Sequence, residues 1–529
     1  MSSRETLLRA LLISWFVLAV PAWAHHDEEQ KLLPSDGVAG DQFGWSVAIF
    51  DETIVVGAPL RGGIGAVYVF VHNGTVFVEQ AILVPSDGAA GDRFGNSVAI
   101  NGDSIIVGAP LADASATNSG AAYVFCWDGV SWFEEQKLQG STLSTNDFFG
   151  RSVSISGSTA LVGAPDGSGS PGAAYVFVRS GTWSEEAKLT AGDSTPGNLF
   201  GHSVSVDGNR LIAGAYAANG NVSSTGAGYV FVRSGTTWSQ EQKIFANDGF
   251  VNDNFGISVS MFAESTVAIG ASGDDDKGIS SGTAYVWKRS GTVWSQSRKF
   301  QGTSAGDLFG GSVSFSYRST LIGARGDDDQ AQDAGTAPVY GDLGSTAVLA
   351  NIFIASDAMP GDNLGNSVAA GSCFMIAGAP KNDELGTDAG AAYVYVLAVP
   401  LVTVRNGTGV NPLCMSTTVA PIIGQNWDIQ VDASAFPTAG FTQILACVAP
   451  LANPLSTQWG EILVSRPSGL LFSSTVAGSG LNLHSIPVPN DPFITGLTAY
   501  QQGIVRNTAF GLIQLCNAED VRIGCHPDD

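Results

Sequence analysis

A short motif recurs seven times in the first three quarters of the chain. A Phe-Gly dipeptide, degenerate as Leu-Gly in the last copy, appears every 51 to 55 residues, beginning at positions 43, 94, 149, 200, 255, 309 and 364. A Gly-Ala dipeptide follows each copy after 14 or 15 residues, beginning at positions 57, 108, 163, 214, 270, 323 and 378. A period near 50 residues with several short strands per unit is typical of a propeller or a solenoid.

The second unit predicts four antiparallel strands. Phe94 to Ile100 alternates apolar and polar residues, and Asn101-Gly102 then signals a tight hairpin turn before Ser104 to Gly108. Ala121 to Phe125 and Ser131 to Leu138 read as the third and fourth strands. A four-stranded meander of this size is one propeller blade, so seven units predict seven blades. The Phe of each motif is expected to wedge between neighbouring blades.

The fourth strand indicates how the ring closes. Its Trp-x-x-x-x-Lys-Leu pattern recurs between units but is missing after the seventh, where the chain runs from Tyr393 to Val399 into Pro400. The end of the same strand, Glu-Glu-Gln-Lys-Leu-Leu without the Trp, stands without its own blade at Glu28 to Leu33. We expect residues 28 to 33 to complete the seventh sheet and to remove its exposed edge. The predicted propeller spans residues 25 to 400.

Composition limits the classes of partner. The formal net charge is −24, which argues against nucleic acid and anionic membranes. It is compatible with cation binding and with plain solubility.

The first 24 residues resemble a secretory signal. A basic start precedes a short apolar run from Leu11 to Val20, and Ala22-Trp23-Ala24 matches an A-x-A cleavage site. No second long apolar stretch follows, so no membrane span is predicted. The expected location is outside the cytoplasm, either secreted or periplasmic or at the cell surface.

The repeats resemble the FG-GAP repeat of integrin-alpha-type β-propellers in a compact bacterial form. The resemblance covers about residues 28 to 400, with Phe-Gly and Gly-Ala-Pro in order and at spacing. It implies a seven-bladed propeller with a role in extracellular binding or adhesion. Many blades of that family carry Ca²⁺ between their first two strands, but the matching loops here, such as Asn101 to Asp103, lack the several oxygen ligands that Ca²⁺ requires. The usual calcium sites are therefore not expected, and no cofactor is predicted with certainty.

Residues 401 to 529 form a second predicted domain. Alternating stretches such as Trp427 to Val431, Glu461 to Val464 and Gly511 to Leu515 favour a small β-sandwich. The segment is similar to C-terminal domains of secreted planctomycete-type proteins. Export permits disulfides there, and sequence leaves three pairings open among four cysteines, Cys414, Cys447, Cys516 and Cys525.

Carboxylates concentrate in two sets of loops. Up-and-down strand order places the loops between blades and the loops between second and third strands at one end of the ring. Asp two residues before the Phe occurs in six units, with Asn198 in the fourth, and is interpreted as an Asx turn whose carboxylate accepts backbone N–H bonds at strand entry. Two Asp triplets are the candidates for a cation site, against the alternative of solvated loop charge: Asp274, Asp275 and Asp276, and Asp327, Asp328 and Asp329.

Three functions remain open. The favoured one is a secreted, non-enzymatic, monomeric propeller that presents its acidic loop face to an extracellular protein or glycan. The second is a polysaccharide hydrolase or lyase with a site in the channel, although the inner strands carry few ionisable residues, chiefly Arg151 and His202. The third is an envelope structural module without a discrete ligand. No catalytic residues are predicted.

Overall fold

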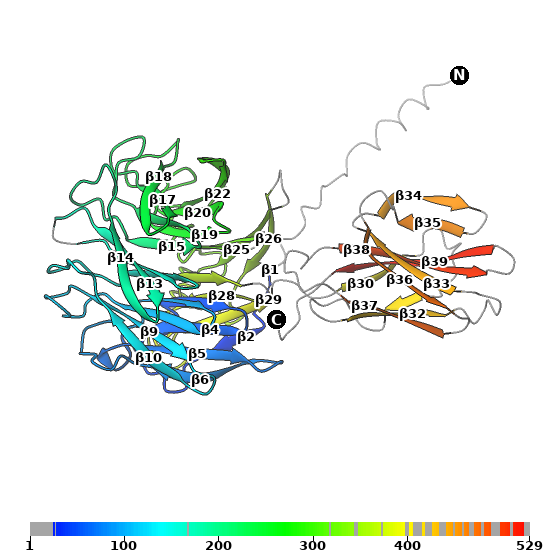
Figure 1. Ribbon diagram of the computed structural model, residues 1–529, viewed down its shortest axis with the longest axis horizontal. Helices are drawn as coiled ribbons and strands as arrows, with labels where there is room; N and C mark the ends of the chain where they lie inside the picture. The colour runs from blue at the N-terminus through cyan, green and yellow to red at the C-terminus, as the bar shows by residue number, and fades with distance from the viewer. Residues whose placement is uncertain are drawn as a thin grey trace, which may run out of the picture.

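The chain is an all-β protein built around a seven-bladed β-propeller (Figure 1). The computed structural model describes residues 25–26, 28–166, 169–316, 319–342, 347–371 and 374–396, together with strands β30 to β39 between residues 401 and 522. The predicted signal, residues 1 to 24, lies outside the described residues.

Each blade is an antiparallel sheet whose strands follow one another outward from the centre. The first four sheets contain β3 (Ser46–Phe50), β4 (Thr53–Ala58), β5 (Ala66–His72) and β6 (Phe77–Leu83); β7 (Ser97–Asn101), β8 (Ser104–Ala109), β9 (Ala121–Trp127) and β10 (Trp132–Leu138); β11 (Ser152–Ser156), β12 (Thr159–Ala164), β13 (Ala173–Ser180) and β14 (Thr182–Leu189); and β15 (Ser203–Asp207), β16 (Arg210–Ala215), β17 (Ala227–Ser234) and β18 (Thr237–Ile244). A short 3₁₀ helix, η1 (Arg61–Gly63), lies between β4 and β5.

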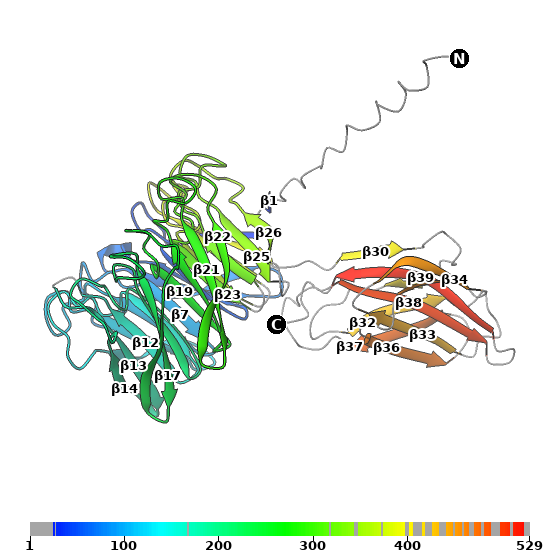
Figure 2. The same ribbon diagram turned by 90° about the horizontal axis from the view of Figure 1, so that it is seen from above.

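The last three sheets contain β19 (Ser258–Phe262), β20 (Thr266–Ala271), β21 (Thr283–Ser290) and β22 (Val293–Gln301); β23 (Ser312–Ser316), β24 (Ser319–Gly323), β25 (Ala337–Asp342), β26 (Ala347–Phe353) and β1 (His25–His26); and β27 (Ser367–Ala370), β28 (Phe374–Ala379), β29 (Ala391–Val396) and β2 (Gln30–Leu32). Each inner strand contacts the inner strand of the next blade, and β27 contacts β3, so the seven sheets form a closed ring. The view from above in Figure 2 shows the same sheets stacked around the ring.

The seventh sheet takes its outer strand from the start of the chain. β2 pairs antiparallel with β29, with Lys31 opposite Tyr393. The side-chain amide of Gln30 reaches into the first blade, where its Nε2 donates to the Phe77 carbonyl at 2.8 Å and its Oε1 accepts from the Phe77 N–H at 2.7 Å. Gln136 makes the same pair of bonds to the Trp183 backbone between blades two and three, at 2.8 and 2.9 Å. The junction between blades seven and one is therefore built like an interior junction.

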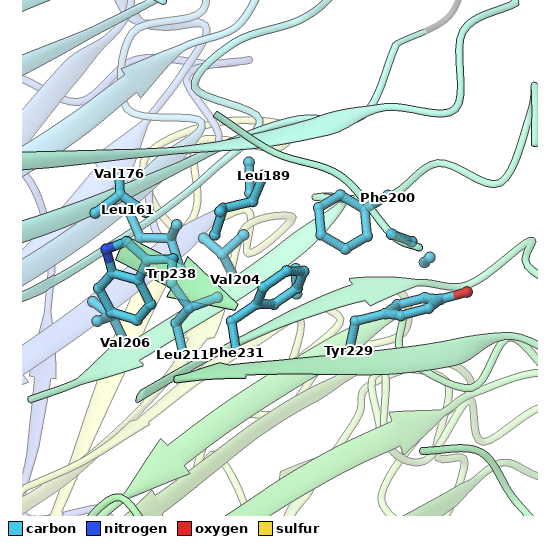
Figure 3. Packing of buried hydrophobic residues seen from close by; sticks show 14 of the residues in the cluster. Leu161, Val176, Leu189, Phe200, Val204, Val206, Leu211, Tyr229, Phe231 and Trp238 are labelled. Atoms are coloured by element: carbon cyan, nitrogen blue, oxygen red, sulfur yellow. The ribbon is translucent and has the colours of Figure 1, made fainter. Parts of the chain in front are cut away.

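The Phe of each motif lies between two blades, as the sequence predicts. Phe200 is fully buried in a cluster that joins Leu161 and Val176 of the third blade to the fourth blade (Figure 3). Its ring meets the ring of Tyr229 edge-on, at 5.6 Å between centroids. Burying such a ring stabilises the fold by roughly 1.5–3 kcal/mol.

The conserved spacing of the motif builds a hydrogen-bonded joint between blades. The Ser that opens each inner strand donates through Oγ to the carbonyl of the Phe-Gly glycine in the next blade. The seven bonds measure 2.8 to 2.9 Å and run from Ser46 to Gly95, Ser97 to Gly150, Ser152 to Gly201, Ser203 to Gly256, Ser258 to Gly310, Ser312 to Gly365 and Ser367 to Gly44. The last of these bonds crosses from the seventh blade to the first.

The Gly of each Gly-Ala dipeptide makes room for this joint. A Cβ on Gly214 would lie 2.1 Å from the Gly256 carbonyl oxygen and 2.2 Å from Ser203 Oγ. Glycine is therefore required here by the close approach of the neighbouring backbone.

The C-terminal segment also contains β-strands. β30 (Leu401–Arg405), β39 (Leu512–Arg522), β38 (Thr498–Asn507), β33 (Phe441–Cys447) and β36 (Leu470–Ala477) form one sheet; β31 (Met415–Thr417), β32 (Asn426–Asp432) and β37 (Leu481–Pro487) a second; and β34 (Pro450–Thr457) with β35 (Gly460–Val464) a third. The β-sandwich arrangement stays a prediction. Cys414 and Cys525 lie outside the described residues, and the side chains of Cys447 and Cys516 do as well, so the predicted disulfides are not placed.

Candidate functional site

The longer loops of the propeller gather at one end of the ring, which we call the FG face. It comprises the inter-blade loops, which carry the Phe-Gly motifs, and the loops between second and third strands. The Phe of each motif forms a parallel bridge with the Gly that precedes the third strand of the previous blade, such as Phe94 with Gly65. The bridge between Phe43 and Gly390 continues this pattern across the closure. The two loop sets therefore support each other on one face, as strand order predicts.

Many loop carboxylates on this face are held by partners within the same blade. Asp87 accepts from Lys137 Nζ at 2.7 Å and from the Tyr123 hydroxyl at 2.8 Å. The same ammonium lies 5.2 Å from the centroid of the Tyr123 ring. The ammonium of Lys137 and the hydroxyl of Tyr123 together hold the pKa of Asp87 below its usual range.

The same unit recurs around the ring with small variations. As in the second blade, a Lys of the outer strand pairs with an Asp of the inter-blade loop in the fourth, fifth and seventh blades, namely Lys243 with Asp193, Lys299 with Asp248, and Lys31 with Asp357. In the third blade Thr142 replaces the Asp and accepts from Lys188 at 2.8 Å. In the first blade Arg61 pairs with Asp36. These loop charges are therefore largely compensated.

In six units the Asp two residues before the Phe, or before Leu364, accepts a backbone N–H as the sequence predicts, but it does not form the predicted Asx turn. Asp92 is buried, and its Oδ2 accepts the N–H of Ala89 at 2.9 Å. The bond reaches three residues backward, whereas an Asx turn reaches forward. The equivalent carboxylates make the same bond, namely Asp41, Asp147, Asp253, Asp307 and Asp362.

The two Asp triplets cap their own loops. Asp274 is buried, and its Oδ1 accepts the Asp276 N–H at 3.0 Å. Asp275 Oδ1 accepts the Ser280 N–H at 2.7 Å, while Asp276 Oδ2 lies 2.5 Å from Lys299 Nζ. The carboxylates of one triplet thus bind different partners.

The second triplet repeats this arrangement. Asp327 Oδ1 accepts the Asp329 N–H at 2.9 Å, and Asp328 Oδ1 accepts the Asp333 N–H at 2.7 Å. Within the described part of the chain, no group of three His, Cys, Asp or Glu side chains is arranged to hold a metal ion. The cation site stays a prediction.

Burial and neighbouring charge perturb two carboxylates of these loops. Burial raises the pKa of Asp253 to about 6, with further contributions from the carboxylates of the Asp274 to Asp276 triplet. Burial also raises the pKa of Asp327 to about 6, against hydrogen bonds that favour its ionised form. Both groups carry an electrostatic cost at neutral pH.

The residue after each Phe-Gly lies at the FG-face end of the inner strands. We call this set the channel-mouth ring: Trp45, Asn96, Arg151, His202, Ile257, Gly311 and Asn366. Neighbouring members touch, since Asn96 Nδ2 donates to the Arg151 carbonyl at 3.2 Å and Asn366 Nδ2 to the Trp45 carbonyl at 3.1 Å. The two ionisable residues that sequence identifies on the inner strands meet here, with Arg151 Nη2 3.4 Å from His202 Nε2.

Large apolar side chains are exposed mainly on the FG face. Of the fourteen exposed ones among the described residues, nine lie in its loops: Val38, Leu60, Val84, Val222, Phe250, Val251, Ile279, Met359 and Leu385. Phe250 is 70% exposed and Ile279 is 79% exposed. Sequence reasoning missed these side chains because it weighed only the charges of the loops.

The described residues contain no helix long and apolar enough to span a membrane. Cys126 is a buried free thiol, as its isolation in the second repeat predicts.

Solved structures similar to this chain share low sequence identity with it. A 6-phosphogluconolactonase homologue from Bacteroides uniformis, itself assigned on a provisional basis, is 10% identical with a TM-score of 0.41 and covers 61% of this chain and 88% of its own. A mutant of the Aleuria aurantia lectin in complex with Fucalpha1-6GlcNAc is 11% identical with a TM-score of 0.36, and the match covers 60% of this chain and 96% of the lectin chain. The SapL1 lectin in complex with alpha methyl fucoside is 13% identical with a TM-score of 0.36, and the match covers 60% of this chain and 99% of the lectin chain. We base no functional argument on these likenesses.

The comparison with curated proteins finds no match. The FG-GAP repeat profile matches seven segments, residues 26–70, 77–125, 132–177, 183–231, 238–287, 294–340 and 349–395. Each match begins in or just before an outer strand and runs into the third strand of the following blade, so the sequence repeat and the structural blade are offset by one strand. Together these segments cover more than half of the chain, which therefore belongs to the FG-GAP repeat family.

Proposed function

We propose that this protein is a secreted, non-enzymatic, monomeric binding module that presents the loops of its FG face to an extracellular protein or glycan. The observation that carries the proposal is the concentration of exposed apolar side chains on these loops. Exposed apolar groups gathered on one surface mark interaction sites.

The most prominent group lies over the fourth and fifth blades. Val222 belongs to the loop between β16 and β17, while Phe250 and Val251 belong to the loop between β18 and β19. The Asn252 N–H donates to the Ser224 carbonyl at 2.9 Å, which ties these two loops together. A Phe side chain has only two rotatable torsions, so ordering it on binding costs little conformational entropy, and Phe250 is a suitable anchor for a partner.

The channel gives less support to the alternative of a hydrolase or lyase. Arg151 and His202 meet at the channel mouth, but burial first, and then the Arg151 charge, lower the pKa of His202 to about 3. An imidazole with such a pKa is a weak general base at neutral pH.

The test is binding of the purified protein to arrays of glycans and extracellular-matrix proteins, with and without Ca²⁺. Phe250→Ser is expected to weaken any binding at least about tenfold, as loss of an aromatic anchor does. Val130→Ser is the matched control, because Val130 is 85% exposed at the opposite end of the propeller, in the turn between β9 and β10. Equal loss in both variants, or turnover of a polysaccharide by the wild type, would contradict the proposal.

A further inference from the structure

The channel-mouth ring contains a cation without a counter-ion. Arg151 is half-buried, and its guanidinium contacts Asn96 Oδ1 and His202 Nε2, each at 3.4 Å. Both acceptors belong to uncharged groups. Of the residues that the structure describes, none forms an ion pair with Arg151, and burial lowers the pKa of its guanidinium.

The state of His202 follows from this contact. A guanidinium can only donate hydrogen bonds, so His202 Nε2 must be the acceptor and the imidazole must be neutral. Tyr216 packs edge-on against the imidazole, with 4.6 Å between ring centroids. His202 is thus fixed as a neutral support for Arg151 and adds no positive charge.

A second cation contributes to the electrostatics of the channel mouth. The charge of Arg93, whose exposed side chain belongs to the inter-blade loop before β7, adds to burial in lowering the pKa of Arg151. The channel mouth is therefore locally positive in a chain of net charge −24.

Three other partly buried arginines of the propeller each have a carboxylate partner. Arg179, Arg233 and Arg289 each pair with a Glu of the preceding blade's outer strand, namely Glu135, Glu186 and Glu241. An ion taken from water without a partner is costly, so this fold normally supplies a carboxylate. At Arg151 the carboxylate is missing, while the planar fork that matches carboxylate or sulfate remains.

We propose that the channel mouth on the FG face binds a small oxyanion, a carboxylate or sulfate group, with Arg151 as its ligand. The net charge of −24 repels extended polyanions, so the ligand carries one anionic group on an otherwise neutral body, as a sugar acid does. This site is separate from the apolar group around Phe250 and does not depend on the function proposed for it.

The test is isothermal titration calorimetry of the purified protein with D-glucuronate and sodium sulfate as probes and D-glucose as the neutral control. The wild type is expected to bind at least one anion and not glucose. Arg151→Gln should weaken that binding about tenfold or more, the usual effect of losing a charge-assisted hydrogen-bonded pair. Arg151→Lys keeps the charge and loses the fork, so it should bind with intermediate affinity. Phe250→Ser should bind the anion like the wild type.

Melting temperature separates ligand binding from a structural role. Without anion, Arg151→Gln should melt at or above the wild-type temperature, because it removes an unpaired charge. Arg179→Gln should melt lower, because it leaves Glu135 unpaired, and it should bind the anion normally. The proposal is overturned if the wild type binds neither anion, if Arg151→Gln binds as tightly as the wild type, or if Arg151→Gln melts lower by as much as Arg179→Gln.

Discussion

Replacing Gly214 by Ala tests the physical reason for the repeated motif. The new Cβ would lie 2.1 Å from the Gly256 carbonyl oxygen and 2.2 Å from Ser203 Oγ. These two atoms are the ends of the 2.8 Å hydrogen bond that joins the fourth and fifth blades. The methyl group therefore breaks this bond and forces the two blades apart.

The cost can be assembled from its two parts. Overpacking a close contact costs about 1–3 kcal/mol. Leaving the buried carbonyl without its donor costs about 1–3 kcal/mol more. We therefore expect the free energy of unfolding to fall by about 2–6 kcal/mol, a large part of the total stability of an ordinary domain.

Equilibrium urea unfolding, followed by tryptophan fluorescence, measures this change. Gly192→Ala is the matched control, because Gly192 is exposed and the nearest atom to its added Cβ is the flexible Gln240 Oε1, 3.3 Å away. The control should change the free energy of unfolding by less than about 0.5 kcal/mol. A loss below about 1 kcal/mol for Gly214→Ala, with an unchanged slope against urea, would refute the role assigned to the joint.

Three further predictions concern charge, closure and metal. Asp327 has a folded-state pKa of about 6, raised from 3.8, so its contribution to stability is complete below pH 3.8 and is lost as the pH rises through 6; after allowance for screening this loss is about 2 kcal/mol. Urea unfolding from pH 4 to 7 should show that Asp327→Asn removes this decline. Asp87 has a lowered pKa in the wild type, so Asp87→Asn should instead reduce the free energy of unfolding at neutral pH. An unchanged pH profile for Asp327→Asn would contradict the assignment. Leu32→Ala in β2 should cost about 2–5 kcal/mol, as should Leu138→Ala at the equivalent place in the second blade, and a cost below 1 kcal/mol for Leu32→Ala alone would argue against closure by β2. Chelation with EDTA should leave the melting temperature unchanged, since the two Asp triplets are capped by internal donors, and a drop of several degrees would assign them a cation.

The sequence predicts the blades well because their signals are local. Phe-Gly, Gly-Ala and the turn residues set strand ends within each unit. Only the seventh unit lacks an outer strand, so residues Glu28 to Leu33 have one place to pair. The role of the invariant Ser is different. Ser203 is a donor whose acceptor, the Gly256 carbonyl, lies 53 residues away in the next blade. Alternation along a strand shows which face a residue occupies and does not identify its partner on another sheet.

The charge on the FG face also depends on partners distant in sequence. Asp87 reads as a free loop carboxylate, yet Lys137 of the outer strand, 50 residues later, neutralises it. Comparison among repeats could have found this pair, because Lys188 faces Thr142 in the unit that lacks the Asp. The contact between Arg151 and His202 could not be predicted, since the curvature of the ring decides whether neighbouring inner strands bring their first residues together.

Zero-length carbodiimide cross-linking of the folded protein, read by mass spectrometry, tests the closed ring most directly. Lys31 Nζ lies 2.5 Å from both Asp357 and Glu384, more than 320 residues away in sequence. A closed seven-bladed ring predicts cross-links from Lys31 to these carboxylates, alongside the interior cross-link of Lys243 to Asp193. If the interior cross-link forms and Lys31 links to other sites or to none, β2 does not close the ring, and the account is wrong.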